Sequence, residues 1–177
     1  NTRSMDADSN IYYLNADNGW LFHLTSHHSM GHCIKMGDGA DNETVEWTIA
    51  YECGYWTGIA AEKGITNWGI SPGTHPSGID LPSDSGQDAQ NYKVRYNIIY
   101  DTLFYGMQLR NTSNFSVHHN EIYNTPHFDD IPGVSSGASG SPQLLMLGLG
   151  AGNILSGNAY SNIIRDAADS ASSGMTV

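Results

Sequence analysis

A short alternation of apolar and polar residues occurs twice in the middle of the chain at a fixed distance. Residues 94–100 read VRYNIIY and residues 117–123 read VHHNEIY, so Val, Asn, Ile and Tyr recur 23 residues apart. A fixed period in the twenties is typical of a solenoid, in which each repeat buries its apolar face only by stacking on its neighbours. The pattern therefore predicts stacked turns of one repeated unit.

The same unit can be followed in both directions along the chain. Residues 45–51, VEWTIAY, have Val and Tyr in the same positions and Thr in that of Asn, and residues 155–158, LSGN, repeat the first half of the unit. Residues 45–51 lie about two periods before residues 94–100, which predicts one degenerate turn between these two units. Residues 155–158 follow residues 117–123 after one period plus an insertion.

A second alternating segment recurs between these units, with the period of a short half-buried strand. It is found at residues 32–36, 57–61, 105–109, 143–147 and 174–177. No segment shows a helical stripe, and the spacing is too short for crossover helices. We therefore expect an all-β stack of coils. Alternation places Lys35, Gln108 and Arg110 on the outer face, and the following residues toward the core: Ile34, Met36, Ile59, Met107 and Leu109.

The run from Val94 to Tyr123 resembles the coils of right-handed parallel β-helix proteins, the pectate-lyase-like superfamily. Their coils read as a Gly-apolar-x-apolar strand, a short turn with Asn or Ser, and a V-x-x-N-x-I strand. The resemblance implies a single parallel β-helix domain over residues 1–177, with about five to six coils. It places a lead-in segment at residues 1–18 and loop insertions at 64–90 and 125–143. Lyases, glycosidases, epimerases, phage tailspikes and surface proteins share this fold, so it does not imply one activity.

The charge and apolar content of the chain argue against some classes of binding partner. The 177 residues include 7 basic and 18 acidic side chains, a net charge of −11, which argues against binding to nucleic acid or to an anionic membrane surface. No window approaches 18 consecutive apolar residues, so no membrane span is predicted. The last repeat-like strand, residues 174–177, would leave an open edge that invites pairing with another chain. We expect part of a longer solenoid or a module that associates end to end.

Two columns of the alignment have a structural interpretation. The first contains Thr48, Asn97, Asn120 and Asn158, and stacked amides in successive turns hydrogen-bond along the stack. The second contains Tyr51, Tyr100 and Tyr123 and predicts an aromatic stack.

The histidines and cysteines are also interpreted as structural. His23, His27, His28 and His32 are dense enough to suggest a transition-metal site. Zinc needs three or four convergent ligands, however, and adjacent strand residues point to opposite faces, so polar turn residues are the favoured interpretation. Cys33 and Cys53 occupy different columns of the alignment, which favours two buried thiols over a disulfide.

Three sequons, at Asn42, Asn111 and Asn114, fall at predicted turns where a glycan could be accommodated. Such sequences also arise by chance in turns rich in Asn and Ser, so unmodified turns remain the alternative.

Candidate chemistry lies where the period breaks, because rigid solenoids carry their sites on loops. The two insertions would flank a groove floored by Lys35, Gln108 and Arg110, a candidate saccharide-binding surface. The polar candidates within the insertions are His75, Asp80, Asp84, His127, Asp129 and Asp130.

The resemblance implies roles for these residues. Polysaccharide lyases of this superfamily neutralise a uronate with calcium or another cation and abstract the α-proton with Lys or Arg. Lys35 and Arg110 would then be the bases, and Asp129 and Asp130 the calcium ligands. A glycosidase would instead pair Asp80 with one of those two aspartates. Substrate contacts are assigned to His75, Gln108 and His127, and no cofactor besides calcium is expected. Solvated polar loops are the alternative for each residue.

Two classes of function follow. The first is a secreted carbohydrate-active or carbohydrate-binding β-helix, a lyase or hydrolase with a polysaccharide partner. The second is a non-catalytic cell-surface, adhesion or tailspike-like module, which the sequons and the open edge favour. The scarcity of Lys and Arg weakens the lyase reading, because a polyanion would meet a negative protein. Both classes imply an extracellular or cell-surface location, and the carbohydrate-active class is placed first.

Overall fold

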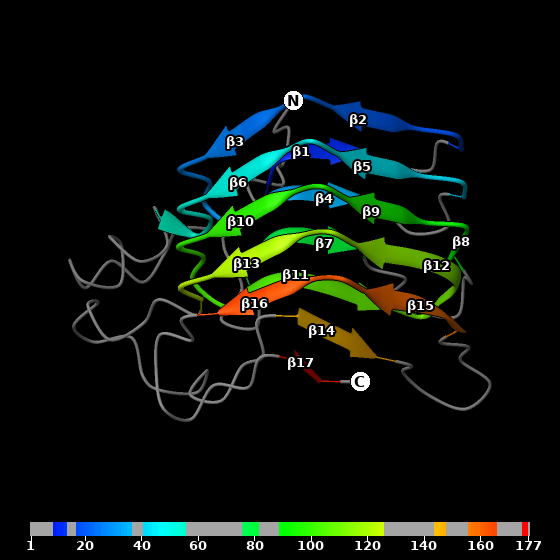
Figure 1. The fold of residues 1–177 in the computed structure, drawn as a ribbon. Coiled ribbons are helices and arrows are strands. Elements are labelled where there is room, and N and C mark those ends of the chain that lie inside the picture. The colour runs from blue at the N-terminus through cyan, green and yellow to red at the C-terminus, as the bar shows by residue number, and fades with distance from the viewer. Residues whose placement is uncertain are drawn as a thin grey trace, which may run out of the picture.

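The computed structural model describes residues 9–13, 17–36, 41–55, 76–81, 89–125, 144–147, 156–165 and 175–176. Their strands form three sheets, here called A, B and C, in which every pairing is parallel (Figure 1). Within these ranges no helix is long and apolar enough to cross a membrane.

The sheets are built from short strands. Sheet A has the order β1 (Ser9–Tyr13), β4 (His32–Met36), β7 (Ser77–Leu81), β11 (Tyr105–Arg110), β14 (Leu144–Leu147) and β17 (Met175–Thr176). Sheet B has the order β2 (Trp20–Phe22), β5 (Thr44–Glu46), β9 (Lys93–Arg95), β12 (Thr112–His118) and β15 (Ser156–Tyr160), with β8 (Ala89–Gln90) also pairing with β12. Sheet C has the order β3 (Thr25–His27), β6 (Ile49–Tyr51), β10 (Ile98–Tyr100), β13 (Glu121–Tyr123) and β16 (Ile163–Arg165).

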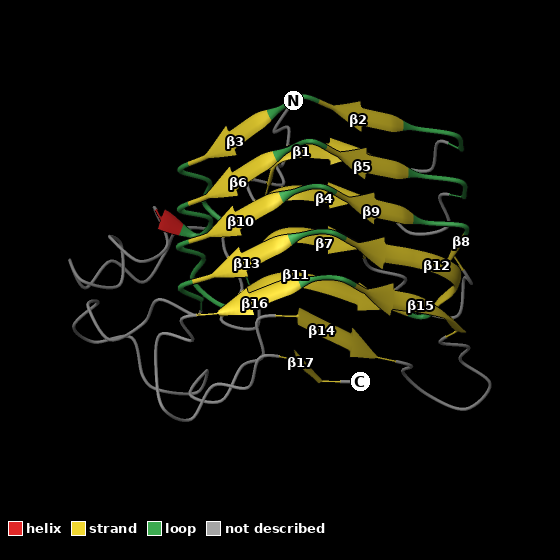
Figure 2. Ribbon diagram, in the orientation of Figure 1, coloured by secondary structure: helices red, strands yellow, loops and turns green. Residues whose placement is uncertain are grey.

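The chain visits the sheets in a fixed sequence. From β2 onward it passes from sheet B to sheet C and then to sheet A, and it returns to sheet B one level further along the stack (Figures 1 and 2). Each strand therefore hydrogen-bonds to the equivalent strands of the coils on either side. This arrangement confirms the predicted parallel β-helix.

The register confirms the repeat and corrects its spacing. Val94 pairs with Val117 and Tyr100 pairs with Tyr123, as the 23-residue period predicts. Val45 pairs directly with Val94, so the degenerate turn expected between these two units does not exist. The extra length belongs to one coil, which contains β7. The range 64–90, predicted to be a loop insertion, thus includes a strand of sheet A, whereas the strand predicted at residues 57–61 lies outside the described residues.

The core is formed by the apolar rows that face the inside of the coils. Sheets B and C each contribute one row, formed by Val45, Val94 and Val117 in sheet B and by Ala50, Ile99 and Ile122 in sheet C. Sheet A contributes two rows, Ile34, Ile79 and Met107 in one and Met36, Leu81 and Leu109 in the other. Every one of these side chains is at most 1% exposed. Ile59, also predicted to face the core, lies outside the described residues.

A row of amides runs beside this core at the corner between sheets B and C. The Thr48 N–H donates to Asn97 Oδ1 at 3.0 Å, and the N–H groups of Asn97 and Asn120 donate to the next Oδ1 in the row at 3.1 Å each. The fourth member is Asn162, whereas the sequence alignment had put Asn158 in this place. Asn158 lies in β15, where it pairs with Ser116.

The predicted tyrosine stack is present at the far end of sheet C. The rings of Tyr51 and Tyr100 are 5.0 Å apart and those of Tyr100 and Tyr123 are 5.1 Å apart, nearly parallel in both cases. His27 stacks on one end, and the Arg165 guanidinium lies 4.1 Å from the last ring centre at the other. The stack thus crosses five coils.

Three rows of residues adopt the left-handed backbone conformation at the corners. The row before sheet B contains Asn18, Asn42, Asn91 and Asn114. The row between sheets B and C contains His23, Trp47, Tyr96, His119 and Ser161, and the row after sheet C contains His28, Glu52, Asp101 and Asn124. Asparagine and aspartate tolerate this conformation best after glycine, because their short polar side chains can hydrogen-bond locally. In the first row, Asn91 Nδ2 donates to Asn42 Oδ1 at 2.9 Å.

The two cysteines are bonded to each other, so the prediction of two buried thiols is wrong. Cys33 in β4 and Cys53 in the turn after β6 have Cα atoms 5.3 Å apart and form a disulfide. The alignment had placed Cys33 over Gly58. In the structure, the turn that holds Cys53 packs against the coil before it, where the Gly54 N–H donates to Ser29 Oγ at 3.2 Å.

Candidate functional site

Four residues that the sequence singles out come together on sheet A. Asp80 in β7 pairs in register with Lys35 in β4 on one side and with Gln108 in β11 on the other. Arg110 follows two residues along β11. We call these four residues the sheet A row. They alternate with core residues such as Ile79 and Leu81, which places them on the opposite face of the sheet.

Asp80 is the centre of the row. Its side chain is 1% exposed, and its Oδ2 lies 3.6 Å from Arg110 Nη2 and 3.4 Å from His32 Nε2. Neither carboxylate oxygen accepts a hydrogen bond at normal distance. A buried carboxylate without hydrogen bonds is costly to hold in the charged form. The guanidinium of Arg110 and the imidazole of His32 are the groups that offset this cost.

His32 is oriented by Ser77, its neighbour in the next coil. The Ser77 backbone N–H donates to His32 Nδ1 at 3.2 Å, and Ser77 Oγ lies 2.8 Å from the same nitrogen. Because a backbone N–H can only donate, Nδ1 is the acceptor, and the proton of the neutral ring sits on Nε2, facing Asp80. The imidazole therefore joins Ser77 to the carboxylate.

Only part of the sheet A row reaches the surface. Lys35 is half-buried and the Arg110 side chain is 18% exposed, whereas Gln108, predicted to face outward, is 6% exposed. The two cations are thus the groups that a ligand can touch, and Asp80 and His32 lie behind them. A carboxylate behind a guanidinium fixes its direction, so Arg110 is held in place to bind an acidic or hydroxyl group.

The sequence did not assign His32 and Ser77 to this site. His32 was interpreted as a turn residue, and Ser77 fell within the predicted insertion. The usable signal was Ser77-Gly-Ile-Asp-Leu81, which repeats the Gly-apolar-x-apolar pattern of β11, Gly-Met-Gln-Leu109. Recognising it as a strand would have placed Asp80 beside Lys35 and Gln108.

The remaining predicted site residues are His75, Asp84, His127, Asp129 and Asp130, and all lie outside the described residues. In the part of the chain that is described, no group of three or more His, Cys, Asp or Glu side chains is arranged to hold a metal ion. Of the sequons, Asn42 and Asn114 are exposed, and Asn111 is 3% exposed. A glycan on Asn111 would require its side chain to leave the interior.

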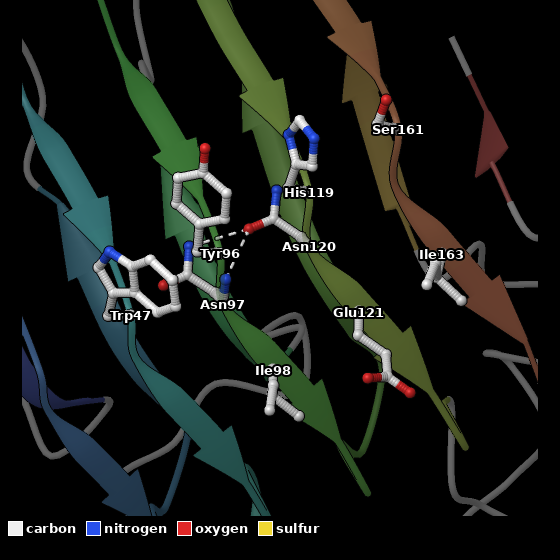
Figure 3. A pocket seen from close by; sticks show the side chains of 9 residues that line it. All are labelled: Trp47, Tyr96, Asn97, Ile98, His119, Asn120, Glu121, Ser161 and Ile163. Atoms are coloured by element: carbon white, nitrogen blue, oxygen red, sulfur yellow. Dashed lines mark hydrogen bonds between the residues drawn. The ribbon is translucent and has the colours of Figure 1, made fainter.

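A shallow pocket of about 260 Å³ lies at the corner between sheets B and C. One wall comes from the left-handed corner row and the other from sheet C, with the amides of Asn97 and Asn120 between them (Figure 3). We call it the corner groove, lined by Trp47, Tyr96, Asn97, Ile98, His119, Asn120, Glu121, Ser161 and Ile163. This pocket was not predicted from the sequence. The signal that could have revealed it is the alignment column immediately before the asparagine column, which contains Trp47, Tyr96 and His119.

Comparison with known proteins supports the fold. No family model matches the sequence, and no curated protein matches it. Two solved structures do, the periplasmic alginate epimerase AlgG and a double mutant of it, each at 14% identity with a TM-score of 0.51. The chain is a right-handed parallel β-helix.

The matches cover 88% of this β-helix and 36% of the epimerase chain, so this chain spans about a third of the length of the protein it matches. At this identity the likeness shows the shared fold alone. Any role of the sheet A row therefore has to be argued from the geometry of its own residues.

Proposed function

We propose that this β-helix is a carbohydrate-active protein that binds and processes a polysaccharide at the sheet A row. The observation that carries the proposal is the convergence of Arg110 and His32 on the buried carboxylate of Asp80, in register with Lys35 and Gln108. Its fold is also that of a solved alginate epimerase, which acts on a polysaccharide.

Two reactions fit this set of groups. In the first, Arg110 binds the carboxylate of a uronate and stabilises the negative charge that develops there as Lys35 removes the α-proton. The glycosidic C–O bond on the neighbouring carbon then breaks, the departing oxygen takes a proton from water, and an unsaturated sugar remains at the new end of the chain. In the second, Asp80 and a second carboxylate from Asp129 or Asp130 act as the acid and base of a glycoside hydrolase, and Arg110 must first move aside because Asp80 lies behind it. Hydrolysis adds water and leaves a saturated sugar end, whereas elimination adds none and leaves a C=C double bond there.

The charge of the protein sets a condition on the first route. A net charge of −11 repels a polyuronate, so a bridging cation is needed for such a substrate to approach. We propose calcium for this role, with Asp129 and Asp130 as ligands, because carboxylate oxygens are its preferred donors. Activity on neutral polysaccharides would not need it.

The disulfide supports an exported protein, since such bonds form and persist in oxidising compartments. We propose an extracellular or cell-surface location, where glycans at Asn42 and Asn114 would point into solvent.

The test is an assay over a panel of uronate and neutral polysaccharides, with and without calcium. Ultraviolet absorbance of unsaturated product is recorded together with new reducing ends. Arg110→Gln and Lys35→Gln should lower the rate on the active substrate by at least about 100-fold. Lys93→Gln, which removes an exposed lysine of sheet B, is the matched control and should act as the parent does. A folded parent that yields neither product on any substrate, or an Arg110→Gln variant of full activity, would refute the proposal.

A second candidate is a non-catalytic surface module that binds glycan or associates end to end. The large apolar side chains left in solvent favour it, among them Trp20 at 63%, Ile163 at 58% and Trp47 at 50% exposure. Such a module would retain a polysaccharide in the same assay without releasing new ends.

A further inference from the structure

The corner row between sheets B and C carries residues that do not suit its backbone. Its members Trp47, Tyr96 and His119 have φ values of 55°, 57° and 55°. A bulky side chain in the left-handed region is strained, because its Cβ approaches the following carbonyl oxygen. The other two corner rows have the same conformation and are built mostly from Asn, Asp and Glu. The fold can therefore be built at such corners without rings.

Trp47 and His119 are exposed to solvent, and Tyr96 between them is half-buried. Trp47 is 50% exposed, and its ring stacks on Tyr96 with centres 4.7 Å apart, while His119 lies 5.2 Å beyond Tyr96. Stacking contacts join the members of this row, whereas in the row before sheet B side-chain hydrogen bonds join Asn42, Asn91 and Asn114. Strained backbone that keeps large exposed side chains points to a functional role for those side chains.

A second row faces the rings across the asparagine amides. Ile98 pairs in register with Glu121, and Glu121 pairs with Ile163, so these three side chains form one line along sheet C. Ile98 and Ile163 are 37% and 58% exposed. The two rows are the walls of the corner groove, which runs from coil to coil along the axis of the helix (Figure 3).

We propose that the corner groove binds a neutral glycan chain lying along the helix axis. Pyranose rings present C–H faces that pack on aromatic and aliphatic walls, and their hydroxyl groups need a few polar partners. His119, Glu121 and Ser161 supply those partners. Successive coils lie about 4.8 Å apart, close to the length of one sugar unit in an extended glycan, so each coil offers a similar contact.

The charges around the corner groove favour a neutral glycan over an acidic one. The lining holds one carboxylate, Glu121, and its Oε1 is 2.6 Å from Arg165 Nη2, so that charge is already paired. None of the described residues that line the groove is a lysine or arginine, and the whole chain has a net charge of −11, which repels polyanions. The inference rests on the proposed function only for the class of ligand, not for any chemistry at the sheet A row.

The test measures binding of neutral and uronate oligosaccharides by titration calorimetry to the parent and to Trp47→Asn and Tyr96→Asn. Asparagine suits the left-handed corner but removes the ring, so relief of strain and loss of stacking oppose each other and Tm should change little. Both variants should weaken neutral-glycan binding at least tenfold. Trp20→Asn, which removes an exposed tryptophan outside the groove, is the matched control and should bind as the parent does.

Asp80→Asn separates this site from the sheet A row. It should bind neutral glycan at the corner groove as the parent does, even where turnover is lost. The inference is overturned if the folded parent binds no neutral glycan, if it binds only uronates, or if both groove variants bind as the parent does with a lower Tm. Self-association of the parent that Trp47→Asn abolishes, with no glycan bound, would assign the groove to a second copy of the chain instead.

Discussion

Asn120 Oδ1 accepts two hydrogen bonds from Asn97, one from its backbone N–H at 3.1 Å and one from its side-chain Nδ2 at 3.0 Å. The Nδ2 group of Asn120 in turn donates to Asn162 Oδ1 and to the Val94 carbonyl, each at 2.9 Å. One buried amide therefore connects three coils at the corner where the chain turns between sheets B and C.

Asn120→Ala should destabilise the protein by roughly 3 kcal/mol, because it leaves the buried Asn97 N–H without its acceptor and removes the side-chain hydrogen bonds to Asn162 and to the Val94 carbonyl. Urea unfolding followed by circular dichroism measures the change. Asn158→Ala is the control: Asn158 is exposed and should change stability by no more than about 0.5 kcal/mol. Equal losses for the two variants would contradict the register described here.

Gly78→Ala should be strongly destabilising. A Cβ at this position would lie 2.3 Å from Ile99 Cγ2 and 2.6 Å from the Gly106 carbonyl oxygen, and the second contact is with backbone that cannot rotate away. Overpacking of a close-packed core costs about 1–3 kcal/mol or more. The measurement is the urea midpoint, compared with Ser116→Ala on the half-buried face of β12. A Gly78→Ala variant as stable as the parent would show that sheets A and C do not approach this closely.

Removing the disulfide should lower stability by about 3 kcal/mol, the value expected for a cross-link that closes a loop of some twenty residues. Thermal melts of the parent with and without reductant provide the measurement. The Cys33→Ala, Cys53→Ala double variant is the control, and its Tm should not respond to reductant. A reductant-insensitive parent with two titratable thiols would contradict the bond.

Glu43 makes stability depend on pH in a defined direction. Burial is the largest cause that raises the pKa of its carboxyl above the usual value; the hydrogen bond from the Gly19 N–H lowers it, and the charges of Asp17 and Asp41 raise it further. A carboxyl whose pKa is higher in the folded state stabilises the fold while it is protonated. That stability is present below about pH 4.3, the usual unfolded value, and is lost as pH rises through the folded pKa.

Glu43→Gln should therefore be more stable than the parent at pH 7, with the difference shrinking toward pH 4. Melts across this range measure it, and Glu121→Gln at the surface is the control. A parent that becomes more stable relative to Glu43→Gln as pH rises would show that folding lowers the pKa of Glu43 and does not raise it.

The repeat and most of the register could be predicted from the sequence because they depend on local patterns. The spacing of Val, Ile and Tyr in residues 94–100 and 117–123 is enough to align two coils, and strand alternation is enough to place Lys35 beside the core residues of β4. Both depend only on neighbouring residues in sequence. The same reasoning failed at β15, where the short LSGN match put Asn158 in the asparagine row. The pairing of β12 with β15 shifts register between Ser113 and Phe115, and a four-residue pattern carries no information about such a shift.

The site was predicted only in part for a related reason. Lys35, Gln108 and Arg110 were placed on one face by alternation, but Asp80 was assigned to a loop because the period of the repeat breaks over residues 64–90. Its contact with His32 spans two coils, and so does the bond between Cys33 and Cys53. Contacts between coils can be predicted only when the number of residues in each coil is known. The coil that contains β7 is longer than the 23-residue repeat, so the repeat does not give its length. The corner groove depends likewise on residues from four coils.

The coil of β9, β10 and β11 advances by 23 residues with matched side chains at its corners. Removing or duplicating those 23 residues would keep valine on valine, amide on amide and tyrosine on tyrosine at the new junction. Such a change would shorten or lengthen the corner groove by one coil and leave its cross-section unaltered. The length of this groove can thus be adjusted in steps of one repeat, by a single in-frame gene rearrangement.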